Sequence, residues 1–259
     1  MIYATANQKG GVGKTTTCLN VATVLSELGK RVLMVDLDPQ AGLTTSLGHN
    51  PEDMQPTIYD LLIDDDDGLE IKQVILKTTL PNLDFVPANL DLSGAEIELI
   101  REMSWDRTLE EKLKPVRNDY DFIFIDCPPS LGVLTTNAFM AAQMVIVPVQ
   151  AEYLAMRGLK QLQKIVAKVQ KKGNPALHIK ILRTMHDSRT IHSTEIVEEL
   201  KRVFGERVFE TVVKRSVKFS ESVAAAQPIV TYAGDSPGAL AYRELAKEIL
   251  DEQNKTAVH

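Results

Sequence analysis

The sequence predicts a doubly wound α/β fold, in which helices cover both faces of a mostly parallel sheet. Two observations predict it. Apolar runs of strand length recur along the chain, at 2–6, 31–38, 122–130 and 144–150, and continuous apolar runs are typical of parallel strands buried on both faces. Segments with helical spacing of apolar residues separate these runs, and such alternation favours a parallel sheet with crossover helices.

The predicted elements follow in chain order. The segment "IYATA" is the first strand, a glycine-rich turn follows it, and apolar residues at helical spacing after Thr15 predict a helix that stops at Gly29. The other three apolar runs are strands of the same sheet. Weaker patterns predict strands at 82–88 and 178–182 and helices at 91–116, 134–142, 155–172, 191–204 and 237–253. We expect one domain over residues 1–253 and a frayed tail over 254–259.

The composition is that of a globular chain, with 259 residues, of which 44% are apolar and 25% charged. Cys18 and Cys127 show no C-x-x-C spacing, so we predict neither a disulfide framework nor a zinc site, and a reduced, cytoplasmic compartment. Neither a signal peptide nor an apolar run of about 18 residues is seen, so we expect no membrane span. The acidic loop 63–70 is interpreted as a solvated surface and not as a metal site.

Charge is distributed unevenly along the chain. The net formal charge is −6, yet residues 157–218 contain 15 Lys and Arg against 6 Asp and Glu. This asymmetry indicates either a surface for a polyanion or a set of solvated helix faces. Charge alone leaves both interpretations open.

The glycine-rich turn, "NQKGGVGKTT", nearly matches the phosphate-binding P-loop pattern G-x-x-x-x-G-K-[ST]. Gly13, Lys14 and Thr15 satisfy its end, but Gln8 stands where the first glycine should be. Because a strand precedes the loop and a helix follows it, its backbone N–H groups form a concave donor surface for phosphates. We therefore predict ATP and Mg²⁺ as cofactors, with Lys14 between the β- and γ-phosphates and the Thr15 hydroxyl on Mg²⁺.

Two apolar strands end in carboxylates that suit a magnesium ion. Asp126 ends the run "FIFID", and we assign it to the Mg²⁺ shell through water. Asp36 and Asp38 stand two residues apart in "VDLDPQ" and share one side of an extended strand. We assign Asp38 to orienting the attacking water and Asp36 to supporting Thr15 or the metal waters. The reverse assignment of Asp36 and Asp38 stays open.

Together, "KGGVGKTT", "VDLDPQ" and "FIFIDCPPSLG" resemble the deviant Walker A ATPases, and within them the ParA/Soj partition proteins, including carboxysome-positioning McdA-like members. The resemblance continues through 147–162, 184–190, 216–222 and 238–250. It implies a homodimer in which the additional lysine, Lys9, crosses to the nucleotide of the second subunit, where a cation supplied in trans stabilises transition-state charge.

The resemblance also implies roles for single residues. The two subunits would approach closely at Gly11, Glu152 would reach the nucleotide sugar, and Met185 would pack on the adenine. The predicted catalytic residues are Lys9, Lys14 and Asp38, and the predicted metal-site residues are Thr15, Asp36 and Asp126. The predicted nucleotide-binding residues are Lys9, Gly10, Gly11, Val12, Gly13, Lys14, Thr15, Thr16, Gln40, Glu152 and Met185.

The same resemblance implies that the ATP dimer binds DNA without sequence preference. The candidate DNA contacts are Arg189, Lys214, Arg215 and Lys218, with Lys201 and Arg202 behind them. The implied partner is a ParB-like or McdB-like adaptor that stimulates hydrolysis, and the implied location is the nucleoid. The implied cargo is a chromosome origin, a plasmid or a protein body such as the carboxysome. This chain has Lys214-Arg215-Ser216 where the partition proteins commonly have Pro-Arg-Asn.

Four other functions are alternatives to a DNA-binding partition ATPase. Membrane docking as in MinD is disfavoured because the C-terminal segment is rich in acidic residues. An iron–sulfur protein of the nitrogenase type needs two cysteine ligands per subunit, and Cys18 is predicted to lie in the core. A DNA-binding repressor is disfavoured because no helix-turn-helix segment precedes the P-loop. The principal alternative is a metabolic ligase or synthetase of the same fold, which would not need the basic segment.

Overall fold

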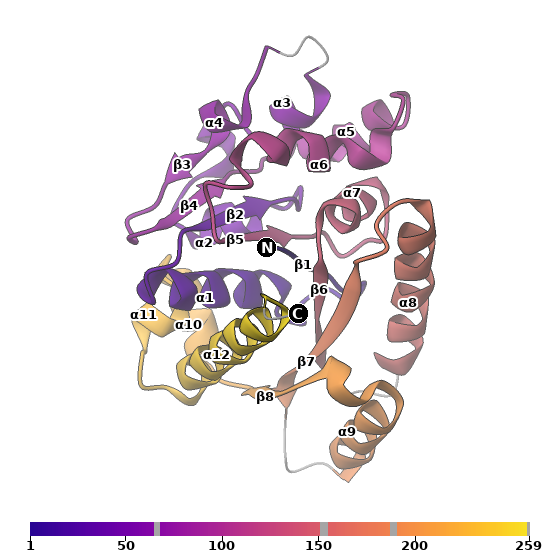
Figure 1. The fold of residues 1–259 in the computed structure, drawn as a ribbon. Coiled ribbons are helices and arrows are strands. Elements are labelled where there is room, and N and C mark those ends of the chain that lie inside the picture. Colours follow the sequence, from indigo (N-terminus) through magenta and orange to yellow (C-terminus); the bar gives the residue numbers. More distant parts are fainter. Residues whose placement is uncertain (65–67, 151–154, 187–190, 258–259) are drawn as a thin grey trace.

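The computed structural model describes residues 1–64, 68–150, 155–186 and 191–257. Its strands form one 8-stranded sheet in the order β3-β4-β2-β5-β1-β6-β7-β8 (Figure 1). All neighbouring strands are parallel except β3 and β4. The predicted doubly wound, mostly parallel sheet is therefore confirmed. The strands are β1 (Ile2–Thr5), β2 (Val32–Asp36), β3 (Leu76–Lys77), β4 (Leu83–Val86), β5 (Phe122–Asp126), β6 (Met144–Gln150), β7 (His178–His186) and β8 (Val208–Lys214).

Helices pack on both faces of the sheet. They are α1 (Lys14–Glu27), α2 (Gly42–Ser46), α3 (Ile58–Ile63), α4 (Ile71–Val74), α5 (Leu92–Leu99), α6 (Thr108–Leu113), α7 (Val133–Ala141), α8 (Ala155–Lys172), α9 (Ile191–Phe204), α10 (Lys218–Ala224), α11 (Ile229–Tyr232) and α12 (Pro237–Ala257). Short 3₁₀ turns lie at Pro51–Asp53, Trp105–Arg107, Lys114–Val116 and Gly205–Arg207.

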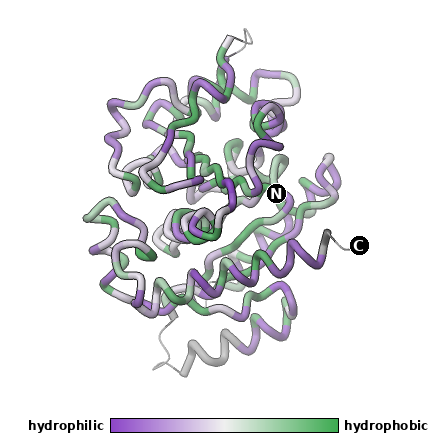
Figure 2. Tube along the Cα trace, turned by 60° about the vertical axis from the view of Figure 1, so that its left-hand side comes forward, coloured by the Kyte–Doolittle hydropathy of each residue, from purple (hydrophilic) through white to green (hydrophobic). Residues whose placement is uncertain are grey.

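Side chains of each strand alternate between two cores, as the two-residue period of a strand requires. In β1, Ile2 and Ala4 belong to one core and Tyr3 to the other. The first core lies between the sheet and the helices α3 to α9, and the second between the sheet and α1, α2, α11 and α12. Figure 2 shows the same arrangement, with hydrophobic segments through the centre of the molecule and hydrophilic ones along the outer helices.

The structure differs from the prediction in several elements. The segment predicted as one helix at 91–116 is divided into α5, α6 and 3₁₀ turns, because Ser104 has a left-handed φ of 61° through which a right-handed helix does not continue. The strands β3 and β8 were not predicted, and β7 continues to His186, beyond the predicted 178–182. Helix α12 reaches Ala257 and includes part of the predicted tail, while the domain boundary itself stays a prediction.

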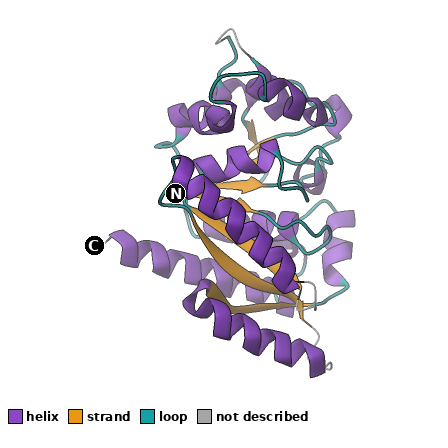
Figure 3. Cartoon of the chain, turned by 90° about the vertical axis from the view of Figure 1, so that its right-hand side faces the viewer, coloured by secondary structure: helices purple, strands orange, loops and turns teal. Residues whose placement is uncertain are grey.

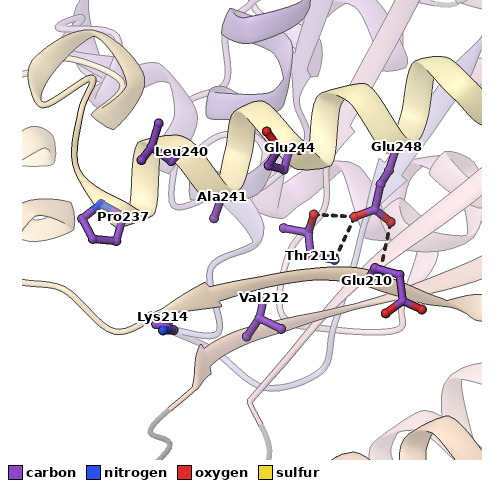
Figure 4. Close-up of a pocket in the computed structure, with 9 residues that line it drawn as sticks. All are labelled: Glu210, Thr211, Val212, Lys214, Pro237, Leu240, Ala241, Glu244 and Glu248. Atoms are coloured by element: carbon purple, nitrogen blue, oxygen red, sulfur yellow. Dashed lines mark hydrogen bonds between the residues drawn. The ribbon is translucent and has the colours of Figure 1, made fainter.

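Strand β8 forms one edge of the sheet, where backbone N–H groups are open to pairing with other chains. The Glu248 carboxylate on α12 accepts hydrogen bonds from the backbone N–H groups of Glu210 at 3.0 Å and Thr211 at 2.8 Å, and a third from the Thr211 hydroxyl (Figure 4). This carboxylate lies in a groove of about 660 Å³ between β8 and α12. Helix α12 thereby occupies two backbone donors of this strand.

Candidate active site

The glycine-rich loop connects β1 to α1 at the carboxyl end of the sheet. Gly11 and Gly13 have positive φ values of 71° and 93°, a conformation that favours glycine over other residues. Gly13 is the N-cap of α1 and makes no side-chain capping bond. Among the described residues, no backbone carbonyl accepts a hydrogen bond from the N–H groups of 10–16. These donors and the positive end of the helix dipole fit an anion such as a nucleotide phosphate.

The two lysines of the loop lie in different environments. The Lys14 side chain is buried, with the residue 7% exposed, whereas Lys9 is exposed on the outer side of the loop. The Lys9 Nζ donates to Gln150 Oε1 at 3.0 Å, and the Lys9 N–H donates to Asn7 Oδ1 at 3.0 Å. Lys9 and Arg157 of α8 line the same pocket, which has a volume of about 460 Å³.

The ends of β2 and β5 place two carboxylates side by side, because Asp36 and Asp126 are partners in the strand register. Asp36 Oδ2 accepts hydrogen bonds from the N–H and the hydroxyl of Thr44, both at 2.8 Å, and its Oδ1 accepts one from the N–H of Asp38 at 3.3 Å. Burial raises the pKa of Asp36 to about 6, although the bonds from Thr44 and Asp38 lower it. These contacts fix the chain that follows β2.

Asp126 has a different set of contacts. Its Oδ1 accepts a hydrogen bond from the Thr5 hydroxyl at 3.1 Å, and its buried Oδ2 has no hydrogen-bond partner among the described residues. Burial raises the pKa of Asp126 to about 7, with the neighbouring Asp36 carboxylate as the second cause. Thr15 and Lys14 lie close enough to lower this pKa, and neither makes a hydrogen bond to Oδ2 that meets ordinary geometry.

This arrangement fits a hydrated divalent cation. A buried carboxylate oxygen without a partner, next to a second carboxylate, would be compensated by a cation or by its bound waters. Within the described residues no three His, Cys, Asp or Glu side chains form a metal cluster. Mg²⁺ does not need such a cluster, since it is usually held by one or two carboxylates together with waters and substrate phosphates.

The loop after β2 brings further polar residues to the P-loop. Asp38 is half-buried, and its Oδ1 accepts a hydrogen bond from the exposed Gln40 N–H at 3.0 Å. A Cβ built on Gly42 would lie 3.6 Å from Thr15 Oγ1, so this loop passes directly beside the predicted magnesium ligand. The predicted site residues Lys14, Thr15, Asp36, Asp38 and Asp126 are thus brought together, and their individual roles stay predictions.

The end of β7 contacts the P-loop from the other side. The Thr184 hydroxyl donates to the carbonyl of Val12 at 2.8 Å. Met185, the predicted adenine contact, is half-buried in the next position and has a left-handed φ of 51°. Glu152 and Arg189, predicted for the nucleotide sugar and for DNA, lie outside the described residues.

The predicted DNA contacts differ in their availability. Lys218 forms a salt bridge with Glu221 at 2.7 Å, and Lys201 and Arg202 pair with Glu210 and Glu199 at 3.3 and 2.7 Å. Lys214 and Arg215 are exposed, and no described acidic residue forms a salt bridge with either. Among the described candidates, these two are the cations without an intramolecular counter-charge.

Three threonines that support the site were not predicted. The hydroxyl of Thr5 donates a hydrogen bond to Asp126, that of Thr44 to Asp36 and that of Thr184 to the carbonyl of Val12. Thr5 had a signal in the sequence, since it is a polar residue in an otherwise apolar strand that ends at the loop. Thr44 and Thr184 had none, because their partners are distant in the sequence.

The structure also bears on two features that the sequence did not predict, a disulfide and a membrane span. Cys18 and Cys127 are both buried and belong to different cores, so no disulfide joins them. In the part of the chain that the structure describes, no helix has both the length and the apolar character of a membrane span.

The chain is similar to known proteins over nearly its whole length. Residues 1–179 match the family model described as an AAA domain. The chain is 47% identical over 249 residues to the sporulation initiation inhibitor protein Soj of Bacillus subtilis, covering 96% of this chain and 97% of Soj. It is 40% identical over 263 residues to the chromosome partitioning protein ParA of Caulobacter vibrioides, covering 99% and 97%.

Solved structures agree with the fold and the cofactors. The structure of cobyrinic acid a,c-diamide synthase from Mycobacterium smegmatis with bound ADP and magnesium has a TM-score of 0.85 and 38% identity, covering 98% of this chain and 95% of that one. Homologous structures thus hold adenine nucleotide with magnesium, which confirms ATP and Mg²⁺ as the cofactors. From these similarities and the P-loop geometry, the chain belongs to the ParA/MinD superfamily of P-loop ATPases.

Proposed function

We propose that this chain is a dimerising ATPase that binds DNA without sequence preference in its ATP form. Its hydrolysis is stimulated by DNA and by a cargo-bound adaptor protein, and the cycle positions or segregates a chromosome origin, a plasmid or a protein body such as the carboxysome. Similarity to Soj and to the chromosome partitioning protein ParA along almost the entire chain supports this proposal.

The observation that carries the proposal is the separation of the two P-loop lysines. Lys14 is buried beneath the loop, whereas Lys9 is exposed and bonded to the end of β6. A Cβ on Gly10 or Gly11 would meet nothing within 4 Å in the monomer, so this side of the loop has room for a second subunit. Lys14 therefore serves the nucleotide of its own subunit, and Lys9 faces the side from which the ATP of a partner subunit would approach.

The remaining site residues have roles in hydrolysis. A bound Mg²⁺ would supply positive charge that offsets the negative charge of the nucleotide phosphates. Thr15 and Asp126 hold it, the latter through water, and Asp36 fixes the loop that carries Asp38 by its bonds to Thr44 and Asp38. Asp38 orients the attacking water, because it is half-buried, lies close enough to Asp126 to influence the pKa of that carboxyl, and uses only Oδ1 for the Gln40 bond.

DNA binding in this proposal begins with Lys214 and Arg215. Both are exposed and without a salt bridge to any described acidic residue. Contacts to backbone phosphates carry no sequence information, so such a pair suits DNA of any sequence. Dimerisation doubles the number of these cations. The chain is accordingly proposed to be associated with the nucleoid.

The test compares wild type, Lys9→Ala and the control Lys72→Ala, a surface lysine on α4. Each is mixed with a non-hydrolysable ATP analogue or with ADP. The mass is measured by light scattering and binding to a random-sequence duplex by anisotropy. Wild type and Lys72→Ala are expected to dimerise and bind DNA with the ATP analogue only. Lys9→Ala is expected to bind nucleotide and remain monomeric, and an unchanged dimer would refute the role of Lys9 in trans.

A second candidate is an ATP-dependent ligase or synthetase, which is favoured by the similarity to cobyrinic acid a,c-diamide synthase at 38% identity. Such an enzyme uses ATP to activate a small carboxylic acid. Its ATPase rate would respond to a metabolite such as cobyrinic acid and would be insensitive to DNA. Measuring ATP turnover with duplex DNA, and separately with cobyrinic acid, distinguishes the two candidates.

A further inference from the structure

Helix α8 carries a continuous basic face. Its 18 residues include no Asp or Glu. Five exposed cations follow each other at every third or fourth position, and we call them the α8 basic face: Arg157, Lys160, Lys164, Lys168 and Lys171. At about 100° per residue these five lie within an arc of about 80°. The opposite side of the helix packs in the first core through Leu159, Leu162, Val166 and Val169.

The cations of the α8 basic face have few acidic neighbours in the described part of the chain. Among the described residues, none of its five cations has a salt-bridge partner within 4.0 Å. Lys160 lies near Glu199 of α9 and contributes, after Arg202, to lowering the pKa of that carboxyl. Lys172, which lies outside the face, pairs with Asp106 at 3.0 Å. Figure 3 looks onto this side of the molecule, where α8 runs across the front of the strands.

The residues of this face favour a phosphate backbone over a protein or a membrane. The exposed residues between the cations are Gln161 and Ala167, so the face contains no large apolar side chain. Protein interfaces use aromatic and aliphatic anchors and are depleted in lysine. A helix that lies on a membrane inserts its apolar side, and here that side is occupied by the core. Phosphate contacts require only accessible cations.

The dimensions of the face match those of a duplex. From Arg157 to Lys171 the helix rises about 21 Å at about 1.5 Å per residue. Over that length a duplex presents about 12 phosphates, or about six on each strand, at one charge per about 1.7 Å. Five cations therefore correspond to the phosphates of one strand.

The α8 basic face is separate from Lys214 and Arg215. Helix α8 packs in the first core, whereas Lys214 lines the groove between β8 and α12, and both α12 and the side chain of Phe219 on α10 pack in the second. Figure 1 shows α8 and α10 on opposite sides of the sheet. We propose that the α8 basic face is a second contact surface for duplex DNA, additional to Lys214 and Arg215. This proposal rests on the DNA binding proposed above, and it assigns phosphate contacts to residues that no sequence motif singled out.

The experiment neutralises four cations of the face in Lys160→Gln/Lys164→Gln/Lys168→Gln/Lys171→Gln. Glutamine and lysine have similar helix propensities, so α8 is preserved. The control, Lys72→Gln/Lys114→Gln/Arg117→Gln/Lys247→Gln, removes the same charge from exposed sites elsewhere. Affinity for a random-sequence duplex is measured with a non-hydrolysable ATP analogue across a salt series. The slope of log affinity against log salt is expected to fall by up to about 3.6 per subunit, at about 0.9 per lost phosphate contact.

The outcomes separate this proposal from the proposed function. A reduced slope in the α8 variant, with the control at the wild-type slope and with nucleotide affinity and dimer mass unchanged, supports the second surface. Wild-type DNA binding with an unchanged slope in the α8 variant overturns the second surface and leaves the proposed function standing. Absence of DNA binding by wild type overturns both. Loss of binding to poly-L-glutamate or to phosphatidylserine vesicles, with DNA binding unchanged, assigns the face to another anion and overturns the proposal.

Discussion

The contacts of Thr44 lead to a quantitative prediction for Thr44→Val. The Thr44 hydroxyl is fully buried, donates to Asp36 Oδ2 at 2.8 Å and accepts from the N–H of Ala88 at 3.0 Å. Valine has nearly the same shape but no hydroxyl. The substitution removes a hydrogen bond to a carboxylate, worth about 1.5–3 kcal/mol, and leaves a buried N–H unsatisfied at a cost of about 1–3 kcal/mol. Since both terms belong to one hydroxyl, we expect a loss of roughly 3 kcal/mol in the free energy of unfolding.

Thermal unfolding followed by circular dichroism measures this loss. For a domain of this size, about 2–4 °C of melting temperature corresponds to 1 kcal/mol, so the melting temperature should fall by about 6–12 °C. The matched control is Thr45→Val on the same helix. Thr45 is exposed and its hydroxyl bonds only to the carbonyl of Ala41, so its effect should stay within about 0.5 kcal/mol. Equal melting temperatures for the two variants would refute the reasoning that Thr44 holds the end of β2.

Three further predictions concern the nucleotide site and its support. Lys14→Ala is expected to abolish ATP binding, because it removes the buried cation of the loop, and wild-type affinity for a fluorescent ATP analogue would exclude the P-loop assignment. Asp38→Ala is expected to bind ATP and dimerise without hydrolysis, and normal phosphate release would move the water-orienting role to Asp36. Tyr242→Phe removes the hydroxyl that lies 3.3 Å from Thr17 Oγ1 between α12 and α1. It should cost about 0.5–1.5 kcal/mol in stability, and an unchanged melting temperature contradicts that contact.

The parts of the site's arrangement that the sequence can predict depend on local pattern. The P-loop lies between a strand and a helix because its glycines and its flanking apolar periods specify that turn. The adjacency of Asp36 and Asp126 was also accessible, since carboxyl ends of parallel strands meet at one edge of a sheet. Thr44 and Thr184 were not accessible, because each depends on a partner from another element.

Among the surface ion pairs, too, some can be predicted from local spacing and others only from the tertiary structure. The pairs Lys218–Glu221 and Arg202–Glu199 are three residues apart on helices, so helical spacing alone would have indicated them. The pair Lys201–Glu210 joins α9 to β8 and requires the tertiary structure. Strand β8 itself was missed because its apolar residues come in adjacent pairs, "VF" and "VV", and do not alternate. The α8 basic face lies within the predicted basic segment, but only the structure shows that its five cations form no salt bridge with a described residue.

The two edges of the sheet restrict how copies of this chain associate by strand pairing. At one edge, β3 has only two residues and is antiparallel to its neighbour. At the other, Glu248 accepts hydrogen bonds from two backbone N–H groups of β8, which are then not available to a foreign strand. Short and blocked edges prevent growth by strand addition. Association of copies of this chain by strand addition is therefore disfavoured at both edges of the sheet, and this protects the fold from cross-β aggregation wherever copies are crowded together.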